Sequence, residues 1–155
     1  VFWIWALPEQ KILIEGNRAM LVNLFSNVLE NACTAAKELE EPTVRVEMIP
    51  QEQDVQVTFE DSGPGFTEFQ LDHATEAFFA SQDLGGLGLN LMIARMLIQQ
   101  HQGRIVLEDE SPYLGGGMVL LSFPYHRSRV DFGKVSWSTP EAKSLPEIDK
   151  QNSCS

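Results

Sequence analysis

The chain has 155 residues, 43% of them hydrophobic, which is enough for one compact core. Its formal net charge of −11 at pH 7 argues against a nucleic-acid-binding surface and against a basic patch for membrane lipids. The two cysteines, Cys33 and Cys154, have neither metal-ligand spacing nor the pattern of a disulfide framework, so we expect a reducing, cytoplasmic setting.

The first segment of the chain is apolar and short. Residues 1–7 (VFWIWAL) are far too few to span a bilayer, and we expect Trp3 and Trp5 to cover a core or an upstream partner. Residues 11–15 (KILIE), which follow a proline, are predicted to form the first strand.

A long amphipathic helix is predicted next. Apolar residues recur at steps of three and four over residues 18–39, Asn17 is a suitable N-cap, and Pro42 lies beyond the end. Residues 43–49 and 54–60 alternate, are rich in Val and Thr, and predict two strands joined by a polar turn.

The second half of the chain predicts one further long helix and two strands. Residues 61–65 (DSGPG) indicate a turn, and a short helix is expected near residues 68–72. Residues 87–101 are predicted to be helical, and residues 104–110 and 118–123 to be strands. This order of elements predicts a two-layer α/β sandwich.

The composition changes near the C-terminus. Residues 1–124 are expected to form one domain. Residues 125–155 contain Ser, Pro, Lys and Glu with few clustered apolar residues, so we predict a linker or disordered tail there.

Three asparagines line one face of the first predicted long helix. Asn23, Asn27 and Asn31 follow one another at intervals of four residues, beside the apolar stripe. Asparagine is a mediocre helix former, with a propensity cost of roughly 0.5 kcal/mol relative to alanine. The row is either a polar face that hydrogen-bonds to neighbouring loops or a set of amide oxygens for a hard cation such as Mg²⁺.

The DSGPG turn also allows two interpretations. Gly63 and Gly65 suit a tight turn, because glycine adopts positive φ angles without strain. Alternatively, Asp61 is a carboxylate at the end of a core strand, where it would accept a hydrogen bond from an exocyclic amine. The two glycines would then let a flat ring approach the backbone.

A glycine cluster, Gly85, Gly86 and Gly88, stands at the start of the second predicted long helix. It is either an ordinary turn before a core helix or a place where helix amides and the helix dipole meet an anion. No Lys or Arg occurs from residue 46 to residue 94, where nine Asp and Glu residues occur. A polyphosphate bound there would therefore need backbone amides, a metal ion or a basic residue from elsewhere.

These segments, in this order, resemble a known family. NVLENA on a helix, DSGPGF after a strand, AFFAS, and GLGL at the start of a helix resemble the N, G1, F and G2 boxes of the GHKL (Bergerat-fold) ATPases. The chain is most similar to the catalytic ATP-binding domain of bacterial sensor histidine kinases, over residues 8–124. The resemblance implies a mixed, mostly antiparallel sheet with helices on one face and a short ATP lid.

The resemblance also implies a role for each matching residue. Asn31 corresponds to the asparagine that coordinates Mg²⁺, and Asn27 to a polar position near the phosphates, here the candidate catalytic residue. Asp61 corresponds to the adenine-binding aspartate, beside Gly63 and Gly65. The lid and the phosphate-binding segment match at Phe78, Phe79, Gly86, Leu87 and Gly88.

The implied activity is that of a protein histidine kinase in two-component signal transduction. Mg-ATP would bind between the N-box helix and the lid, and the γ-phosphoryl group would pass to a histidine on an upstream dimerisation domain. A response regulator receiver domain is the expected further partner. None of His73, His101 and His126 has the context of an acceptor histidine. We expect the isolated domain to be monomeric and cytoplasmic, with any membrane anchor in upstream segments of the full-length protein.

The sequence leaves two alternatives open. A degenerate family member would sense nucleotide or dock signalling partners without transferring phosphate. Gln82 and Leu84 favour it, because the family commonly has a lysine and a glycine there. An anti-sigma-type serine kinase shares the fold, but the AFFAS and GLGL segments favour the histidine kinases.

Overall fold

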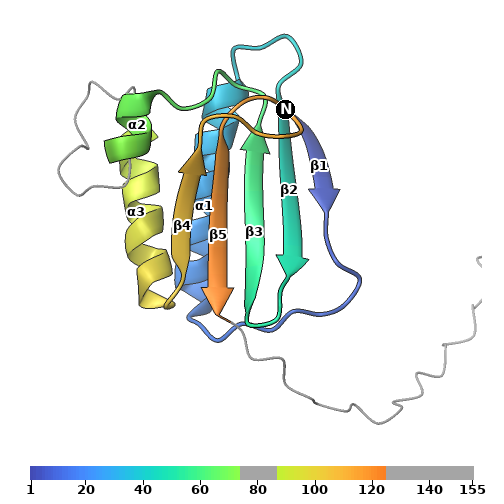
Figure 1. Cartoon of the computed structure of the whole chain (residues 1–155), viewed down its shortest axis with the longest axis vertical. Helices are drawn as coiled ribbons and strands as arrows, with labels where there is room; N and C mark the ends of the chain where they lie inside the picture. Colours follow the sequence, from blue (N-terminus) through green and yellow to red (C-terminus); the bar gives the residue numbers. More distant parts are fainter. Residues whose placement is uncertain (74–86, 125–155) are drawn as a thin grey trace, which may run out of the picture.

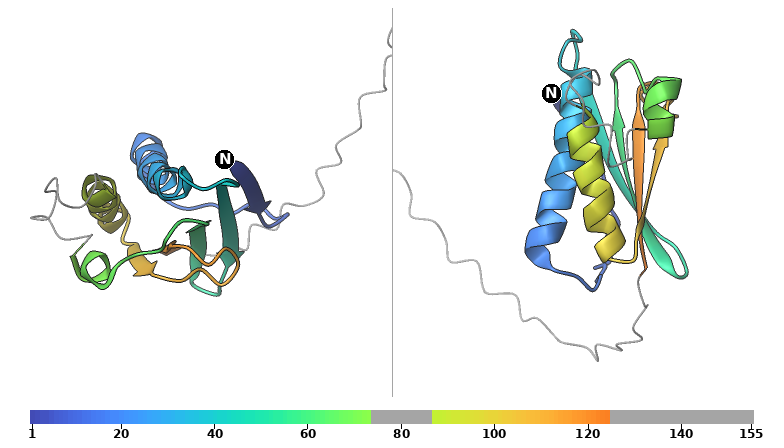
Figure 2. Two further views of the ribbon diagram at one scale, coloured as in Figure 1. Left: turned by 90° about the horizontal axis from the view of Figure 1, so that it is seen from above. Right: turned by 90° about the vertical axis from the view of Figure 1, so that its left-hand side faces the viewer.

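An open five-stranded sheet with helices on one face forms the protein (Figure 1). It is known from a computed structural model, which describes residues 1–73 and 87–124. Seen from above, the two long helices lie on one side of the sheet (Figure 2). The predicted two-layer α/β sandwich is therefore confirmed.

The sheet is mixed and mostly antiparallel, as predicted. Its strands are β1 (Phe2–Ala6), β2 (Thr43–Pro50), β3 (Asp54–Asp61), β4 (Arg104–Glu108) and β5 (Met118–Pro124). They lie in the order β1-β2-β3-β5-β4. β1 pairs with β2 in parallel, and the other three neighbouring pairs are antiparallel.

Two long helices, α1 (Arg18–Ala36) and α3 (Leu87–Gln100), cover one face of the sheet, and a short helix, α2 (Glu68–His73), follows the turn after β3. α1 begins where predicted because Asn17 caps it. The side-chain oxygen of Asn17 accepts a hydrogen bond from the backbone N–H of Met20 at 3.1 Å.

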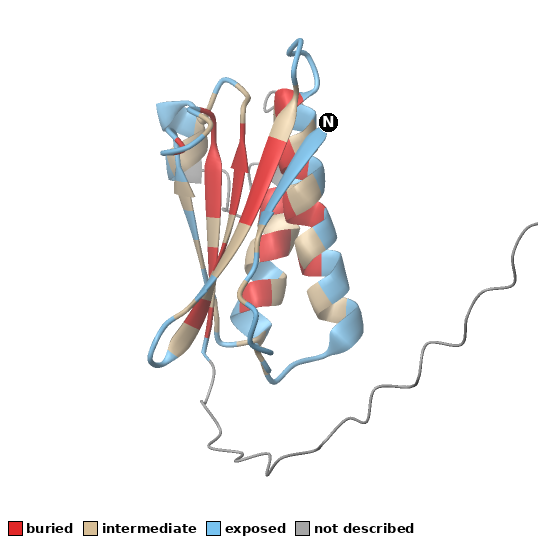
Figure 3. Cartoon of the chain, turned by 90° about the vertical axis from the view of Figure 1, so that its right-hand side faces the viewer, coloured by how far each residue is buried: buried red, intermediate tan, exposed pale blue. Residues whose placement is uncertain are grey.

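The core lies between the sheet and the two long helices (Figure 3). Strand register decides which side chains enter it, because residues opposite each other share a face. Val46 lies opposite Phe59, and Val44 lies opposite Asp61. All four therefore face the helices. Buried side chains from both layers fill the space between: Leu24, Val28, Leu91, Ile98, Val55, Leu121 and Phe123.

The first strand is not where the sequence analysis placed it, and that prediction is wrong. Residues 11–15 form no strand, and Phe2–Ala6 pairs with β2 instead. β3 pairs with one edge of β2, and β1 pairs with the remaining edge. Ile12 and Ile14 still pack against the core. The apolar pattern of the segment thus indicated burial without specifying a backbone partner.

The other predicted elements are confirmed, with small shifts at their ends. α1 ends at Ala36 and leaves Leu39 44% exposed. β4 ends at Glu108 instead of residue 110. The predicted tail at residues 125–155 lies outside the described residues.

β1 presents a large apolar surface. Trp3 and Trp5 stack with ring centroids 5.7 Å apart, on the sheet face that also carries Val44 and Val46. They remain 42% and 56% exposed, so the described residues do not bury these two rings as core side chains are buried. Among those residues, no helix has both the length and the apolar character needed to cross a bilayer.

Candidate functional site

Asp61 lies at the end of β3 with a buried carboxylate, and the residue is only 3% exposed. Its Oδ1 accepts hydrogen bonds from the backbone N–H groups of Gly63 at 2.8 Å and Gly117 at 3.3 Å. Among the described residues, no donor is assigned to Oδ2. A ligand can therefore donate a hydrogen bond to Oδ2 without displacing any group in the described part of the chain.

The backbone packs closely around Asp61, and this requires glycine. A Cβ on Gly63 would lie 2.7 Å from the carbonyl oxygen of Ala35 and 2.7 Å from Asp61 Oδ1. A Cβ on Gly116 would collide with the backbone carbonyl oxygen of Asp61. Gly65 has a φ of +79°, a conformation that side chains disfavour. The segment is thus both a tight turn and a stretch of bare backbone beside a carboxylate, so its two interpretations are compatible.

Two of the three asparagines of α1, Asn27 and Asn31, are buried, whereas Asn23 is exposed. Asn27 is 8% exposed and donates from Nδ2 to both the backbone oxygen and Oδ1 of Asn23, each at 2.8 Å. Asn31 is 1% exposed, and its Oδ1 has no hydrogen-bond partner among the described residues. Leaving a buried polar atom unpaired costs roughly 1–3 kcal/mol. An unpaired, buried amide oxygen therefore fits a site that a cation completes.

Two segments, the turn after β3 and the beginning of α3, meet the C-terminal half of α1. The turn after β3 contacts α1 where Gly63 packs on Ala35, one helical turn beyond Asn31. The beginning of α3 lies beside the same stretch, where Asn90 Nδ2 donates to Glu30 Oε2 at 3.5 Å. Figure 1 shows the end of β3, the end of α1 and the beginning of α3 at one end of the molecule. The predicted carboxylate, amide and glycine groups are therefore gathered there.

The phosphate-binding and lid residues are described only in part. Leu87 and Gly88 form the start of α3, whose N-terminus lies at this same end of the molecule. Phe78, Phe79 and Gly86 fall outside the described residues, so their roles stay predictions. Within the described part of the chain, no group of three His, Cys, Asp or Glu residues is arranged to hold a metal.

Burial sets the electrostatics of Asp61. It raises the pKa of the carboxyl above its usual value, and the backbone hydrogen bonds from Gly63 and Gly117 lower that pKa by a smaller amount. Among the described residues, no charged side chain contributes to the shift. The site therefore holds its carboxylate with backbone donors alone.

Sequence analysis missed the loop between β4 and β5 as part of this site. Gly117 donates to Asp61 Oδ1, and its carbonyl oxygen accepts from the backbone N–H of Asp61 at 3.0 Å. Gly116 packs against the same backbone. The run of glycines at residues 115–117, directly before a strand, was the available signal, because such runs mark close backbone approach.

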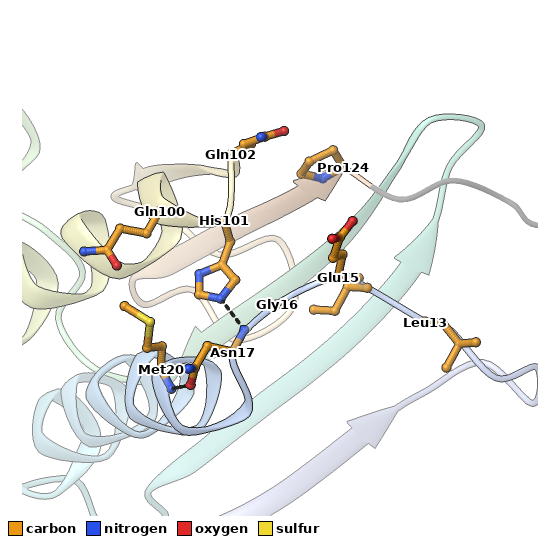
Figure 4. A pocket seen from close by; sticks show the side chains of 10 residues that line it. Leu13, Glu15, Gly16, Asn17, Met20, Gln100, His101, Gln102 and Pro124 are labelled. Atoms are coloured by element: carbon orange, nitrogen blue, oxygen red, sulfur yellow. Dashed lines mark hydrogen bonds between the residues drawn. The ribbon is translucent and has the colours of Figure 1, made fainter.

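A pocket of about 690 Å³ lies at the opposite end of the sheet, between the start of α1, the end of α3 and Pro124 (Figure 4). His101 links the two helices there. Its Nδ1 donates to the carbonyl oxygen of Leu97 at 2.8 Å, and its Nε2 accepts from the backbone N–H of Asn17 at 3.2 Å. These two bonds require the neutral ring with a proton on Nδ1. None of the predicted site residues lines this pocket.

A mixed sheet covered by helices on one face, with a buried aspartate between glycines and a buried asparagine beside it, is the arrangement of a GHKL-type nucleotide-binding domain. The profile of the family described as histidine kinase-, DNA gyrase B-, and HSP90-like ATPase matches residues 16–127. The chain belongs to this family of ATPases.

Curated relatives of the chain include histidine kinases and sensor proteins. It is 30% identical over 128 residues to the signal transduction histidine-protein kinase BaeS of Escherichia coli, an alignment that covers 79% of this chain and 26% of BaeS. It is 33% identical over 116 residues to the C4-dicarboxylate transport sensor protein DctB of Pseudomonas aeruginosa, covering 74% of this chain and 18% of DctB. The chain thus spans only about a quarter or less of the length of these relatives.

Solved structures show the same fold. The catalytic domain of the histidine kinase ThkA superposes with a TM-score of 0.68 at 22% identity, over 79% of both chains. The ATP-binding domain of PrrB from Mycobacterium tuberculosis gives a TM-score of 0.61 at 25% identity, again over 79% of both chains. The predicted family and fold are therefore confirmed, as is the predicted class, an ATP-binding domain of the histidine kinase type.

Replacing Asp61 by asparagine is expected to stabilise the protein more at neutral pH than at acid pH. Folding raises the pKa of this carboxyl, so the native state holds its proton more tightly than the unfolded state does. The contribution of Asp61 to stability therefore falls as pH rises from about 4 through the folded pKa. Asparagine keeps an oxygen for both backbone donors and does not ionise.

Urea unfolding of the wild type and Asp61→Asn at about pH 4 and about pH 7 measures this effect. The free energy of unfolding of the variant relative to the wild type should increase with pH. A difference that stays constant, or that falls with pH, would contradict the environment assigned to Asp61.

Proposed function

We propose that this chain binds ATP with Mg²⁺ and donates the γ-phosphoryl group to a histidine on a separate dimerisation domain, in two-component signalling. The observation that carries the proposal is the buried carboxylate of Asp61, with Oδ1 held by two backbone donors and Oδ2 left for a ligand. Membership of an ATPase family supports ATP as the nucleotide. Similarity to BaeS, a histidine-protein kinase, supports histidine as the acceptor.

Asp61 is the proposed adenine-binding residue. Its Oδ2 accepts a hydrogen bond from the exocyclic amine, and such a bond to a charged group contributes about 1.5–3 kcal/mol. Guanine has a carbonyl oxygen at the corresponding position, and two acceptors facing each other would repel. Gly63 and Gly65 would present bare backbone to the flat ring, while the places of their missing side chains are taken by the backbones of Ala35 and Asp109. The carboxylate thus supplies both affinity and selectivity.

Residues of the two long helices, α1 and α3, are proposed to bind the phosphates. Asn31 Oδ1 is the group that fits Mg²⁺, and the ion would supply charge neutralisation for the phosphates. Leu87 and Gly88 offer backbone amides at the N-terminus of α3, where the helix dipole favours an anion, and Gly86, which precedes them in the sequence, is proposed to share this role. Phe78 and Phe79 belong to the proposed lid. No lysine is needed in this arrangement.

Asn27 is the proposed catalytic residue. Within the described part of the chain both of its hydrogen bonds use Nδ2, and its side-chain carbonyl oxygen has no partner there. That oxygen orients a water molecule or the reacting phosphate, one helical turn before Asn31. An amide does not titrate, so Asn27 positions the reactants and is not a general base.

The acceptor histidine belongs to another domain in this proposal. A histidine nucleophile needs a free ring nitrogen, and both nitrogens of His101 are engaged. His126 lies outside the described residues, and His73 ends the short helix α2. The proposed partners are a dimerisation domain and a response regulator receiver domain. We further propose residues 1–124 as a monomeric, cytoplasmic catalytic domain and residues 125–155 as a linker or tail.

Replacing Asp61 by asparagine is expected to weaken binding of a fluorescent ATP analogue by about ten- to a hundredfold, because the amide can turn a donor toward the exocyclic amine. Fluorescence titration measures this, with the matching GTP analogue as the selectivity control. Unchanged ATP affinity in Asp61→Asn would show that adenine does not bind at this carboxylate.

Asn31→Ala is expected to abolish the gain in ATP affinity that Mg²⁺ gives, while affinity measured with a chelator stays near that of the wild type. The substitution removes a buried amide oxygen that has no partner among the described residues and takes away the proposed protein ligand of the ion. Thr34→Ala, an exposed position on the same helix, is the matched control. If Asn31→Ala retained the full effect of Mg²⁺, another group would hold the ion.

Incubation of the chain with an upstream histidine-containing domain and γ-labelled ATP is expected to label that domain. The label should resist base and be lost in acid, as expected of a phosphohistidine. Nucleotide binding without any transfer would instead support the second candidate, a degenerate nucleotide-sensing or docking module, which Gln82 and Leu84 favour.

A further inference from the structure

A buried ion pair lies on the sheet face opposite the helices. Arg45 and Glu60 are register partners, next to Val44 and Asp61, which point to the helix side. Arg45 Nη1 donates to Glu60 Oε1, and Arg45 Nη2 lies 3.0 Å from Glu47 Oε1. Burial alone would lower the pKa of the Arg45 guanidinium, but its hydrogen bonds to Glu60 and Glu47 outweigh burial and raise it. The charge of Arg45 is therefore firmly held.

Ser111 connects this ion pair to the loop between β4 and β5. Its Oγ donates to Glu60 Oε2 and accepts from the backbone N–H groups of Tyr113 at 3.3 Å and Leu114 at 3.0 Å. The Tyr113 ring lies 3.8 Å from the guanidinium of the pair. Ser111 N–H also donates to the carbonyl oxygen of Gly116 at 2.6 Å. Figure 1 shows the loop crossing the face of the sheet away from α1.

The other end of the same loop holds Asp61. Gly117 donates to Asp61 Oδ1, and Asp61 N–H donates back to its carbonyl oxygen. Glu60 and Asp61 are neighbours in β3 and point to opposite faces of the sheet. One loop therefore contacts both faces, through Ser111 at Glu60 and through Gly117 at Asp61.

We propose that Arg45, Glu60 and Ser111, here called the latch, are positioning residues for the nucleotide site. The latch fixes the loop, and the loop sets the Gly117 N–H against Asp61 Oδ1, so that Oδ2 is aimed at the adenine amine. The latch lies on the far face of the sheet and does not touch the nucleotide. The inference rests on the proposed function, because it assigns the latch an effect on nucleotide binding.

The pH dependence of nucleotide binding distinguishes a positioning role of the latch from a role in stability alone, because it depends on the protonation of Asp61. The two backbone donors oppose the effect of burial on its pKa. The neighbouring carboxylate of Glu60 faces away and is paired with Arg45, and no charged side chain among the described residues contributes. A loosened loop would remove the Gly117 donor and raise the pKa of Asp61 further. Loss of nucleotide binding on acidification would then begin at higher pH.

The test compares Ser111→Ala with Thr58→Val. Ser111→Ala removes the hydroxyl that joins the loop to Glu60 and leaves the ion pair intact. Thr58 lies on the same face of the same strand, and its hydroxyl is buried without a partner among the described residues, so Thr58→Val removes a hydroxyl without disturbing the latch. Affinity for the fluorescent ATP analogue is measured from about pH 5 to about pH 8 for both variants and the wild type.

Ser111→Ala is expected to weaken binding about three- to tenfold at neutral pH and to move the acid loss of binding upward by roughly half a pH unit. Thr58→Val should match the wild type. If Ser111→Ala fails to fold, Tyr113→Ala, at a ring that is 66% exposed, should give a smaller shift in the same direction.

Two negative results would have different consequences for the two proposals. A wild-type chain that binds no ATP analogue would overturn the proposed function and the latch proposal with it. A wild type that binds, with variants whose pH profiles are unshifted, would overturn the latch proposal alone, because a uniform loss of affinity is what a merely structural role predicts.

Discussion

The burial of a carboxylate at the end of the central strand is the constraint on which the site depends. Taking such a group out of water costs several kcal/mol unless other donors replace the water. The backbone N–H groups of Gly63 and Gly117 donate hydrogen bonds to Asp61, and no positively charged side chain among the described residues contributes. These donors require backbone to approach within reach, so side chains are excluded at Gly63 and Gly116. Because both donors reach the same oxygen, the support leaves the other oxygen for a ligand.

The same requirement explains why α1 and α3 matter beyond their part in the core. Gly63 packs on Ala35, so the turn that supports Asp61 rests directly on α1. One helical turn earlier, Asn31 is buried with an unpaired oxygen, and Asn90 at the beginning of α3 reaches Glu30 on the same stretch. The packing that forms the core therefore also brings an acceptor for an amine, an acceptor for a cation and a helix N-terminus to one end of the sheet.

Local pattern predicted the two long helices and strands β2 to β5, because burial on one face leaves a periodic signature. It failed for β1, since the partner of that strand is decided by the free edge of β2 and not by the strand's own residues. Motif order pointed to Asn31 and Asp61, but the asymmetry between the two oxygens of Asp61 depends on Gly117, 56 residues further along. Ser111 left no local signal, because its partner Glu60 is 51 residues away.

Glu60 and Asp61 show how strand register separates a structural carboxylate from a ligand-binding one. Both oxygens of Glu60 are occupied, by Arg45 and by Ser111, whereas Asp61 keeps one oxygen available. A slip of one residue between β2 and β3 would exchange the two faces and turn Asp61 away from α1. A buried ion pair contributes little net stability compared with apolar side chains of the same size, while loss of one partner leaves a costly unpaired charge. The value of the Arg45–Glu60 pair in the latch therefore lies less in net stability than in holding Glu60 where Ser111 and its loop can bind it.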